Sequence, residues 1–591
     1  MASQACSPPI QPVQTGNRLG VAALALAIGA LAAIGVFLLP FSFPPSHPSL
    51  SAAYTAGFNN RVAAVAAVLV GVLSFALAWK FDLFPSRAED PDRESTPKWV
   101  VISCVAASAA FTVAVGYLLC KVELASVDNR LFLECMDDVA RYHQRLYGDF
   151  SFVYGPLPLY FPLFVYWLLR PVHIGIEGSY YVALTATHVF GLVIAWLTLE
   201  VLPLGRKTKS ITLCMLAILS MCPVMGLNYT LIRFLAPFST LLFASRIKNP
   251  SLVALAFFLG EALQLGISSE VGFAFAAGAC FYANCMIAKH GPAWIPALVA
   301  PLLAGVAFLF LAGPHYLESM RKYSHGDYNL IVEPLGYIIL FLIATLWLVP
   351  RMLAGAFRQR RPEAVLLASL FVVSLGFVPP AFGLCDPLHV FFNGAGIFVL
   401  ASVAIGGYSR RIRQLWFFCF ACSLMWMQFV NFMLRPDVKQ AVGFAPGASE
   451  QKNWIDVAKL ESIVGDAKIS VPFWVPLGVE NELKRSGHFL PDRESFNLLV
   501  TNPDAEKARM ARMDRAQWAL IPAKDFLIKE TVSNTSRILG IGYNFYPIRR
   551  QPYVYGAILL NELQTHWTPV ASVGDWIVYR QNAQKGQSFD P

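Results

Sequence analysis

The chain has 591 residues, of which 56% are hydrophobic and only 14% are charged, and its mean hydropathy is +0.52. Soluble domains carry about 25% charged residues, so this composition excludes an ordinary soluble protein over most of the length and indicates a membrane protein. The net charge of +9 does not indicate a nucleic-acid partner, because Lys and Arg fall in short clusters between apolar blocks, the pattern that sets membrane orientation.

A polar N-terminus, residues 1–18, precedes a long apolar region, residues 19–434. A membrane-spanning helix needs about 20 apolar residues, and thirteen blocks in this region approach or reach that length, so the sequence predicts about 13 transmembrane helices. No cleavable signal peptide is expected, because the first block is long enough to remain in the membrane. The blocks are residues 19–41, 62–79, 99–119, 179–203, 211–227, 230–245, 251–267, 271–288, 292–313, 334–350, 363–383, 389–407 and 414–434.

A fourteenth apolar block, residues 157–169, is short and interrupted by Pro158 and Pro162. If it does not cross, all five basic clusters lie on the cytoplasmic side with the N-terminus; if it crosses, the last four move outside, against the positive-inside rule. The sequence therefore predicts a juxtamembrane or re-entrant helix here, on the outer face. The basic clusters are residues 80–98, 205–210, 246–248, 351–361 and 408–413.

This topology makes residues 121–178 one long outer loop and places residues 435–591 outside the cytoplasm, with a bacterial inner (plasma) membrane as the expected location. Long loops of membrane proteins often carry function. Within the loop, residues 131–146 predict a helix whose acidic and basic side chains recur every three or four positions on one face. These side chains are Glu134, Asp137, Asp138, Arg141 and Arg145.

Two interpretations of these carboxylates stay open. The first is a solvated face with an Asp137–Arg141 ion pair. The second is a general base or a metal ligand held at the membrane surface, since a sugar hydroxyl needs a proton acceptor and a leaving phosphate needs cations or a metal. No cofactor is certain from the sequence, and a divalent metal is left open.

The order of features in this loop resembles the GT-C superfamily of glycosyltransferases, which includes the protein O-mannosyltransferases and the aminoarabinose transferases. Gly148-Asp149-Phe150 is similar to the Gly-Asp-aromatic turn of that family, and residues 154–160 (YGPLPLY) are similar to its Pro-containing juxtamembrane helix. The family's acidic pair would fall at Leu133-Glu134, where its first member is absent. Glu134 is therefore the first candidate for the base, by its spacing to Gly148, with Asp128, Asp137 and Asp138 as displaced alternatives.

The resemblance implies a sugar donor linked to a polyprenyl phosphate whose lipid lies between helices, and transfer in one displacement with inversion. The acceptor would be a glycan, a lipid or a protein, and membrane lipid is the remaining partner. Two other classes remain as alternatives: a secondary transporter, for which the internal repeat expected of many such folds is not evident, and a polysaccharide polymerase or ligase, which would carry its large outer loop late in the helical region.

Several polar residues near the outer helix ends are further candidates. Arg233 is costly at membrane depth unless it meets a phosphate or carboxylate, or reaches the interface. The candidates for donor-phosphate binding are Arg233, Arg321, Lys322 and His325. Tyr154, Asp386 and His389 are the other candidates, the last two as a phosphate-proximal or metal pair or as a helix-end hydrogen bond.

Residues 435–591 have the composition of a soluble domain. Residues 467–472, 518–521 and 576–579 predict strands, and residues 454–464 and 504–513 predict helices. A small α/β or α+β domain is expected, without a catalytic constellation of its own. It would cover the site or grip the acceptor, or serve only as a tether.

Overall fold

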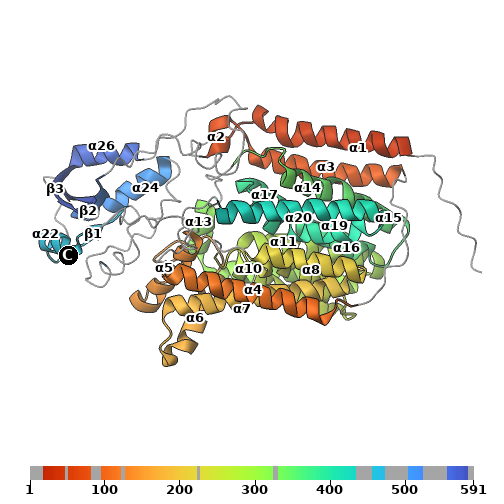
Figure 1. Cartoon of the computed structure of the whole chain (residues 1–591), viewed down its shortest axis with the longest axis horizontal. Helices are drawn as coiled ribbons and strands as arrows, with labels where there is room; N and C mark the ends of the chain where they lie inside the picture. The colour runs from red at the N-terminus through yellow and green to blue at the C-terminus, as the bar shows by residue number, and fades with distance from the viewer. Residues whose placement is uncertain are drawn as a thin grey trace, which may run out of the picture.

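The computed structural model describes residues 18–46, 51–81, 95–121, 127–221, 226–323, 330–433, 455–472, 483, 503–514, 516–523 and 556–582. Figure 1 shows a long bundle of helices and, beyond one end of it, a small domain that contains a β-sheet. The polytopic helical fold and the separate C-terminal domain predicted from composition are both present.

Each of the thirteen apolar blocks is mostly helical where the structure describes it. The bundle comprises α1 (Arg18–Ala32), η2 (Ala33–Leu38), η3 (Leu39–Ser42), α2 (Ala52–Ala56), α3 (Asn60–Lys80), α4 (Lys98–Lys121), α5 (Val127–Tyr142), α6 (Leu157–Leu169), η4 (Arg170–Val172), α7 (Ile176–Val201), α8 (Arg206–Ser220), α9 (Leu231–Ala244), α10 (Pro250–Ile267), α11 (Ser269–His290), η5 (Pro292–Trp294), α12 (Ile295–Ala312), α13 (Pro314–Tyr323), α14 (Gly336–Ile343), η6 (Ala344–Leu348), α15 (Val349–Arg358), α16 (Ala364–Leu375), α17 (Val378–Leu384), α18 (Pro387–Asn393), α19 (Ala395–Ile405) and α20 (Arg410–Met433).

Within the described ranges, nine continuous helical segments are long and apolar enough to cross a membrane, and α18 with α19 makes a tenth candidate that bends by 66°. Two apolar helices are shorter: α9, which contains Pro237, and the α6 segment, Leu157–Val172. The predicted short helix at residues 157–169 therefore has the predicted bounds. Phe164, Trp167 and Leu168 on α6 are exposed, as expected for a helix that rests against lipid.

The predicted helix over residues 131–146 is shifted in the structure, where α5 spans Val127–Tyr142. The helix stops because His143 adopts a left-handed conformation (φ 53°) and the Gln144 N–H bonds back to the Asp138 carbonyl, 3.1 Å away. Such a left-handed residue is a usual helix terminator. Arg145 therefore lies outside the helix, and the prediction that it shares a helix face with Glu134 was wrong.

The C-terminal domain has a four-stranded sheet in the order β1-β2-β4-β3, from β1 (Ile469–Ser470), β2 (Trp518–Pro522), β3 (Trp567–Val573) and β4 (Trp576–Gln581). The β1–β2 pair is parallel and the other pairs are antiparallel. Helices α22 (Val457–Val464), α24 (Pro503–Met513) and α26 (Ala557–His566) complete it. Its apolar core, which includes Trp567 and Trp576, is separate from the core of the bundle.

Candidate functional site

The segment between α5 and α6 is closed by a tight turn around Gly148. The Asp149 carboxylate accepts the Arg145 N–H at 2.7 Å and lies 3.4 Å from the Arg145 guanidinium. The backbone hydrogen bond from Arg145 is the main cause that lowers the pKa of Asp149, and the Arg145 side chain adds to it. The Gly-Asp-aromatic motif thus forms a turn, as its sequence suggested.

Two other elements hold the rest of this segment in place. The Ser319 hydroxyl of α13 bonds both the N–H and the carbonyl of Phe152, at 2.9 and 2.8 Å. The Gly155 N–H donates to the carbonyl of Ile267, at the end of α10 (3.0 Å). A Cβ atom on Gly155 would lie 2.3 Å from the carbonyl oxygens of Leu265 and Gly266. Glycine is therefore required for the segment to lie this close to α10.

Tyr154, fixed by these contacts, connects α5 to α9. Its ring stacks on Phe132 of α5, with centroids 5.8 Å apart and planes 8° apart. The Arg233 guanidinium carbon lies 4.8 Å from the centroid of the same ring, within the range of a cation–π interaction. The Tyr154 hydroxyl accepts a hydrogen bond from the Asn228 side chain (2.7 Å). The structure therefore brings two of the predicted candidates, Tyr154 and Arg233, into contact.

Arg233 is held by three groups that come from different parts of the chain. Its Nη1 donates to the Asn228 carbonyl (2.8 Å), and its Nη2 forms an ion pair with the Glu270 carboxylate at the start of α11. Its Nε is buried and has no hydrogen-bond partner among the described residues. The guanidinium is therefore positioned but not saturated. We call Tyr154, Asn228, Arg233 and Glu270 the Arg233 cluster.

The carboxylates of α5 differ in their surroundings. Glu134 pairs with Arg130 on the same helix, and Asp137 pairs with Arg141 at 3.0 Å. Asp138 has no exposed surface. The predicted Asp137–Arg141 ion pair is present, but Asp138 does not belong to a solvated face. For Asp128 the structure describes only the helical backbone.

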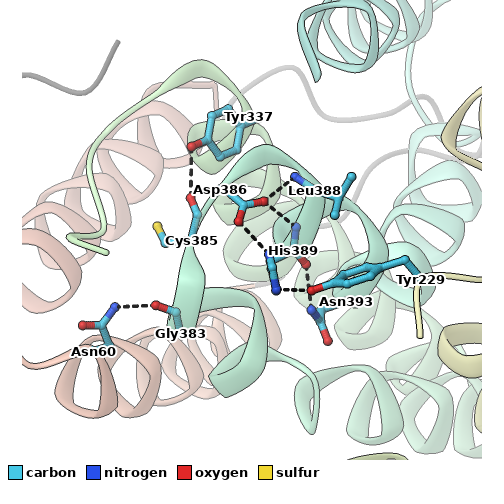
Figure 2. Close-up of polar contacts among 9 residues, drawn as sticks. All are labelled: Asn60, Tyr229, Tyr337, Gly383, Cys385, Asp386, Leu388, His389 and Asn393. Atoms are coloured by element: carbon cyan, nitrogen blue, oxygen red, sulfur yellow. Dashed lines mark hydrogen bonds and ion pairs between the residues drawn. The ribbon is translucent and has the colours of Figure 1, made fainter. Parts of the chain in front are cut away.

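A second chain of polar contacts lies beside the Arg233 cluster and is drawn in Figure 2. Asp386 caps α18, accepting the N–H groups of Leu388 (2.9 Å) and His389 (3.0 Å), and its other oxygen lies 2.6 Å from His389 Nδ1. His389 Nε2 in turn contacts the Tyr229 hydroxyl. We call Asp386, His389 and Tyr229 the His389 chain. The predicted Asp386–His389 pair exists, and it is also the helix-end hydrogen bond that was its alternative.

Three predicted phosphate candidates cannot be placed. Arg321 and Lys322 belong to α13, but the structure describes only their backbone. His325 falls outside the described residues. Among the residues that are described, no group of three or more His, Cys, Asp or Glu side chains could hold a metal ion.

Glu270, Tyr229 and Asn228 were not singled out by sequence reasoning. Glu270 sits one residue into α11 and Tyr229 just before α9, so each reads as an ordinary polar residue at a helix end. A weak signal existed: Asn228, Tyr229 and Arg233 share one short polar interruption between apolar blocks. The pairing of Arg233 with Glu270 crosses 37 positions, and periodicity does not reveal contacts at that range.

Solved structures similar to this chain include two of ArnT from Cupriavidus metallidurans. The form bound to undecaprenyl phosphate has 10% identity and a TM-score of 0.39, over 87% of this chain and 97% of that one. The apo form has 11% identity and a TM-score of 0.41, over 88% and 98%. No family model and no curated protein sequence matches the chain. At these TM-scores the likeness carries no argument about activity, so the functional case rests on the site itself.

Proposed function

We propose that the protein is a membrane glycosyltransferase that moves a sugar from a polyprenyl-phosphate donor to an acceptor at the outer face of the membrane. The observation that carries this proposal is the contact between Tyr154 and Arg233. Tyr154 belongs to the segment that follows α5, and Arg233 is a partly buried cation on α9. Their contact links the α5 carboxylates, the candidate proton acceptors, to a candidate phosphate ligand.

Arg233 supplies what a departing lipid phosphate requires. Negative charge grows on the phosphate oxygens as the bond to the sugar breaks, and a fixed guanidinium stabilises that charge. The unpartnered Nε is one donor for a phosphate oxygen. The partly exposed Glu270 carboxylate holds the guanidinium until the donor arrives. Arg321 and Lys322, on α13, are proposed as additional cations, with His325 just beyond the helix.

A carboxylate of α5 is proposed as the base that takes the proton of the acceptor hydroxyl. The helix geometry changes the order of the candidates. Position 128 lies one helical turn before Phe132, which stacks on Tyr154, whereas position 134 is two residues after Phe132 and faces the other side of the helix. Glu134 is also engaged by Arg130. We therefore rank Asp128 ahead of Glu134, with Asp137 and Asp138 after them.

The C-terminal domain is proposed to cover the site or to grip the acceptor. In Figure 1, α5 and α13 lie at the end of the bundle that faces this domain. The domain thus lies on the side of the bundle where the proposed transfer occurs. The same proposal includes the topology inferred from the basic clusters, in which the loop of residues 121–178 and the C-terminal domain both lie on the outer side of the membrane.

The test compares four isosteric variants: Asp128→Asn, Glu134→Gln, Asp137→Asn and Asp138→Asn. Membranes that contain each variant receive radiolabelled polyprenyl-phosphate hexose or pentose, and transfer to endogenous acceptors is measured. Loss of the base should lower transfer by roughly 10²–10⁴-fold, with little change in thermal unfolding. We expect that loss in Asp128→Asn. Its appearance in Glu134→Gln instead would reverse the order of the residues, and full transfer by all four variants would refute the glycosyltransferase proposal.

A further inference from the structure

The His389 chain has a defined direction of hydrogen bonding. A carboxylate only accepts, so the Asp386 oxygen 2.6 Å from His389 Nδ1 requires a proton on that nitrogen. A ring that carries only this proton leaves Nε2 as an acceptor, and the Tyr229 hydroxyl, which lies against Nε2, is then the donor.

Tyr229 is adjacent in the chain to the residue that organises the Arg233 cluster. The Asn228 carbonyl accepts from Arg233 Nη1, and the Asn228 side chain donates to the Tyr154 hydroxyl. The Arg233 N–H closes the same turn on the Thr230 carbonyl at 3.1 Å. The Tyr229 ring is also packed against Phe392 of α18 (5.7 Å between centroids). A displacement of Tyr229 would therefore shift the neighbouring Asn228, whose carbonyl binds Arg233 and whose side chain binds Tyr154.

We propose that Asp386 and His389 are positioning residues that act through Tyr229 to hold the 228–230 turn, and with it Arg233, in the geometry that receives the donor phosphate. Asp386 does this by selecting the Nδ1-protonated tautomer of His389, which leaves Nε2 to accept the Tyr229 hydroxyl. The inference rests on the proposed function, and it adds α18 to the elements that build the site.

A second buried tyrosine near the His389 chain provides a matched control. Tyr337 of α14 lies close by and donates its hydroxyl to the Cys385 carbonyl (3.0 Å), as Figure 2 shows. Like Tyr229 it is a buried tyrosine whose hydroxyl is hydrogen-bonded near α18, but its bond to Cys385 does not lead to His389 or to Arg233. Tyr337→Phe thus removes an equivalent hydroxyl without breaking the chain.

The first experiment tests the tautomer and needs no ligand. The protein is labelled with ¹⁵N-histidine, and the His389 signals are identified by their loss in His389→Gln. We expect a protonated Nδ1 in the wild type. Asp386→Asn keeps the helix cap, but its amide can donate to Nδ1, so the proton should move to Nε2. A wild-type ring protonated on Nε2 alone, or an unchanged tautomer in Asp386→Asn, would overturn the proposed role of Asp386.

The second experiment measures binding of undecaprenyl phosphate in detergent to Tyr229→Phe, Asp386→Asn and Tyr337→Phe. Loss of one neutral hydrogen bond corresponds to an effect of about two- to tenfold. We expect weakening of that size in Tyr229→Phe, which removes the bond, a smaller one in Asp386→Asn, where Nε2–H can still donate to the Tyr229 hydroxyl, and none in Tyr337→Phe. Because the chain acts through Arg233, Tyr229→Phe should cost little more once Arg233→Lys is present.

The outcomes separate the two proposals. Unchanged binding in Tyr229→Phe, or a loss that adds in full to that of Arg233→Lys, would refute the positioning role while leaving the glycosyltransferase proposal intact. A wild-type protein that does not bind the lipid phosphate would refute the phosphate site, and the positioning role with it, whereas the histidine tautomer would still decide whether the chain itself exists.

Discussion

Two partly buried ion pairs lie at opposite ends of the bundle and differ in how completely their charges are satisfied. At one end, Lys209 of α8 bonds Glu200 of α7 at 3.0 Å. At the other, Arg233 of α9 pairs with Glu270 of α11. Both cations stand in helices of the bundle, yet their surroundings indicate different uses.

The Lys209–Glu200 pair, which we call the closed pair, has all of its charged atoms hydrogen-bonded within the protein. One Glu200 oxygen accepts the Thr96 N–H (2.8 Å) and the Trp196 indole N–H (3.2 Å), and the other accepts Lys209, whose ammonium also lies 3.4 Å from the Glu200 carbonyl. The Lys209 side chain is only 4% exposed. The pair joins α7, α8 and the segment before α4, and the Lys209 ammonium and both Glu200 carboxylate oxygens all have hydrogen-bond partners.

The Arg233 pair is open by comparison. Its carboxylate is 29% exposed, and one guanidinium nitrogen has no partner within the described ranges. Buried ion pairs are weak evidence for stability, and here the difference in saturation is more informative than burial. A saturated pair fastens helices, whereas a pair with a spare donor and an accessible partner is suited to exchange its carboxylate for a phosphate.

The largest expected effect is on the closed pair. Lys209→Met leaves the partly buried Glu200 without its counter-charge, so the free energy of unfolding should fall by about 3 kcal/mol, the lower end of the range for breaking a buried pair, because the Glu200 side chain is 21% exposed. Thermal unfolding in detergent measures it, and the double variant with Glu200→Gln should recover most of the loss. Binding of lipid phosphate by the folded fraction should not change. A specific loss of binding would mean that the closed pair also serves the site.

Arg233→Gln should weaken lipid-phosphate binding by about ten- to a hundredfold, since a charge-assisted hydrogen bond contributes roughly 1.5–3 kcal/mol. The single variant also leaves Glu270 without its partner, so it should lower stability. Adding Glu270→Gln separates the two effects: the thermal unfolding temperature should rise again while binding stays weak. If binding returned together with stability, Arg233 would be a structural residue like Lys209.

Gly155→Ala tests whether the open pair depends on its supporting loop. The new methyl group meets two carbonyl oxygens of α10 at 2.3 Å, and such overpacking costs about 1–3 kcal/mol. The displaced segment should take Tyr154 away from Arg233, so lipid-phosphate binding should weaken too. Gly175→Ala is the matched control, because nothing lies within 4 Å of its Cβ. Equal behaviour of the two variants would show that the loop does not hold the site.

The smallest effect belongs to the exposed Arg145–Asp149 pair, with side chains 81% and 40% exposed. The pKa of Asp149 is lowered, so its contribution to stability is complete above the unfolded value of about 3.9 and is lost as pH falls through the folded value. Asp149→Asn should cost at most a few tenths of a kcal/mol. In a carboxyl ¹³C titration, Arg145→Ala should return the pKa only partly, because the backbone N–H remains. A complete return would assign the shift to the guanidinium.

The α5 segment shows where prediction from sequence ends. The Asp137–Arg141 pair was predictable because it needs only helical spacing, and the bounds of α6 followed from its length and prolines. The end of α5 was misplaced, because the left-handed His143 gives no signal in side-chain periodicity. Arg145 consequently lies outside the helix and pairs with Asp149. Glu134 pairs with Arg130 because α5 begins at Val127, before the predicted start at residue 131.

Length, hydropathy and charge placement by themselves determined that this chain is a polytopic helical protein with a soluble C-terminal domain, since burial in lipid requires long apolar helices whatever their arrangement. Tyr154 became a candidate through the resemblance of its segment to the GT-C family, Arg233 through its depth in an apolar block, and Asp386 with His389 through their spacing. Only the tertiary structure decided that Arg233 meets Glu270 and Tyr154, and that His389 meets Tyr229. Those contacts join residues 37 to 160 positions apart, and helix packing, which no local pattern encodes, brings them together.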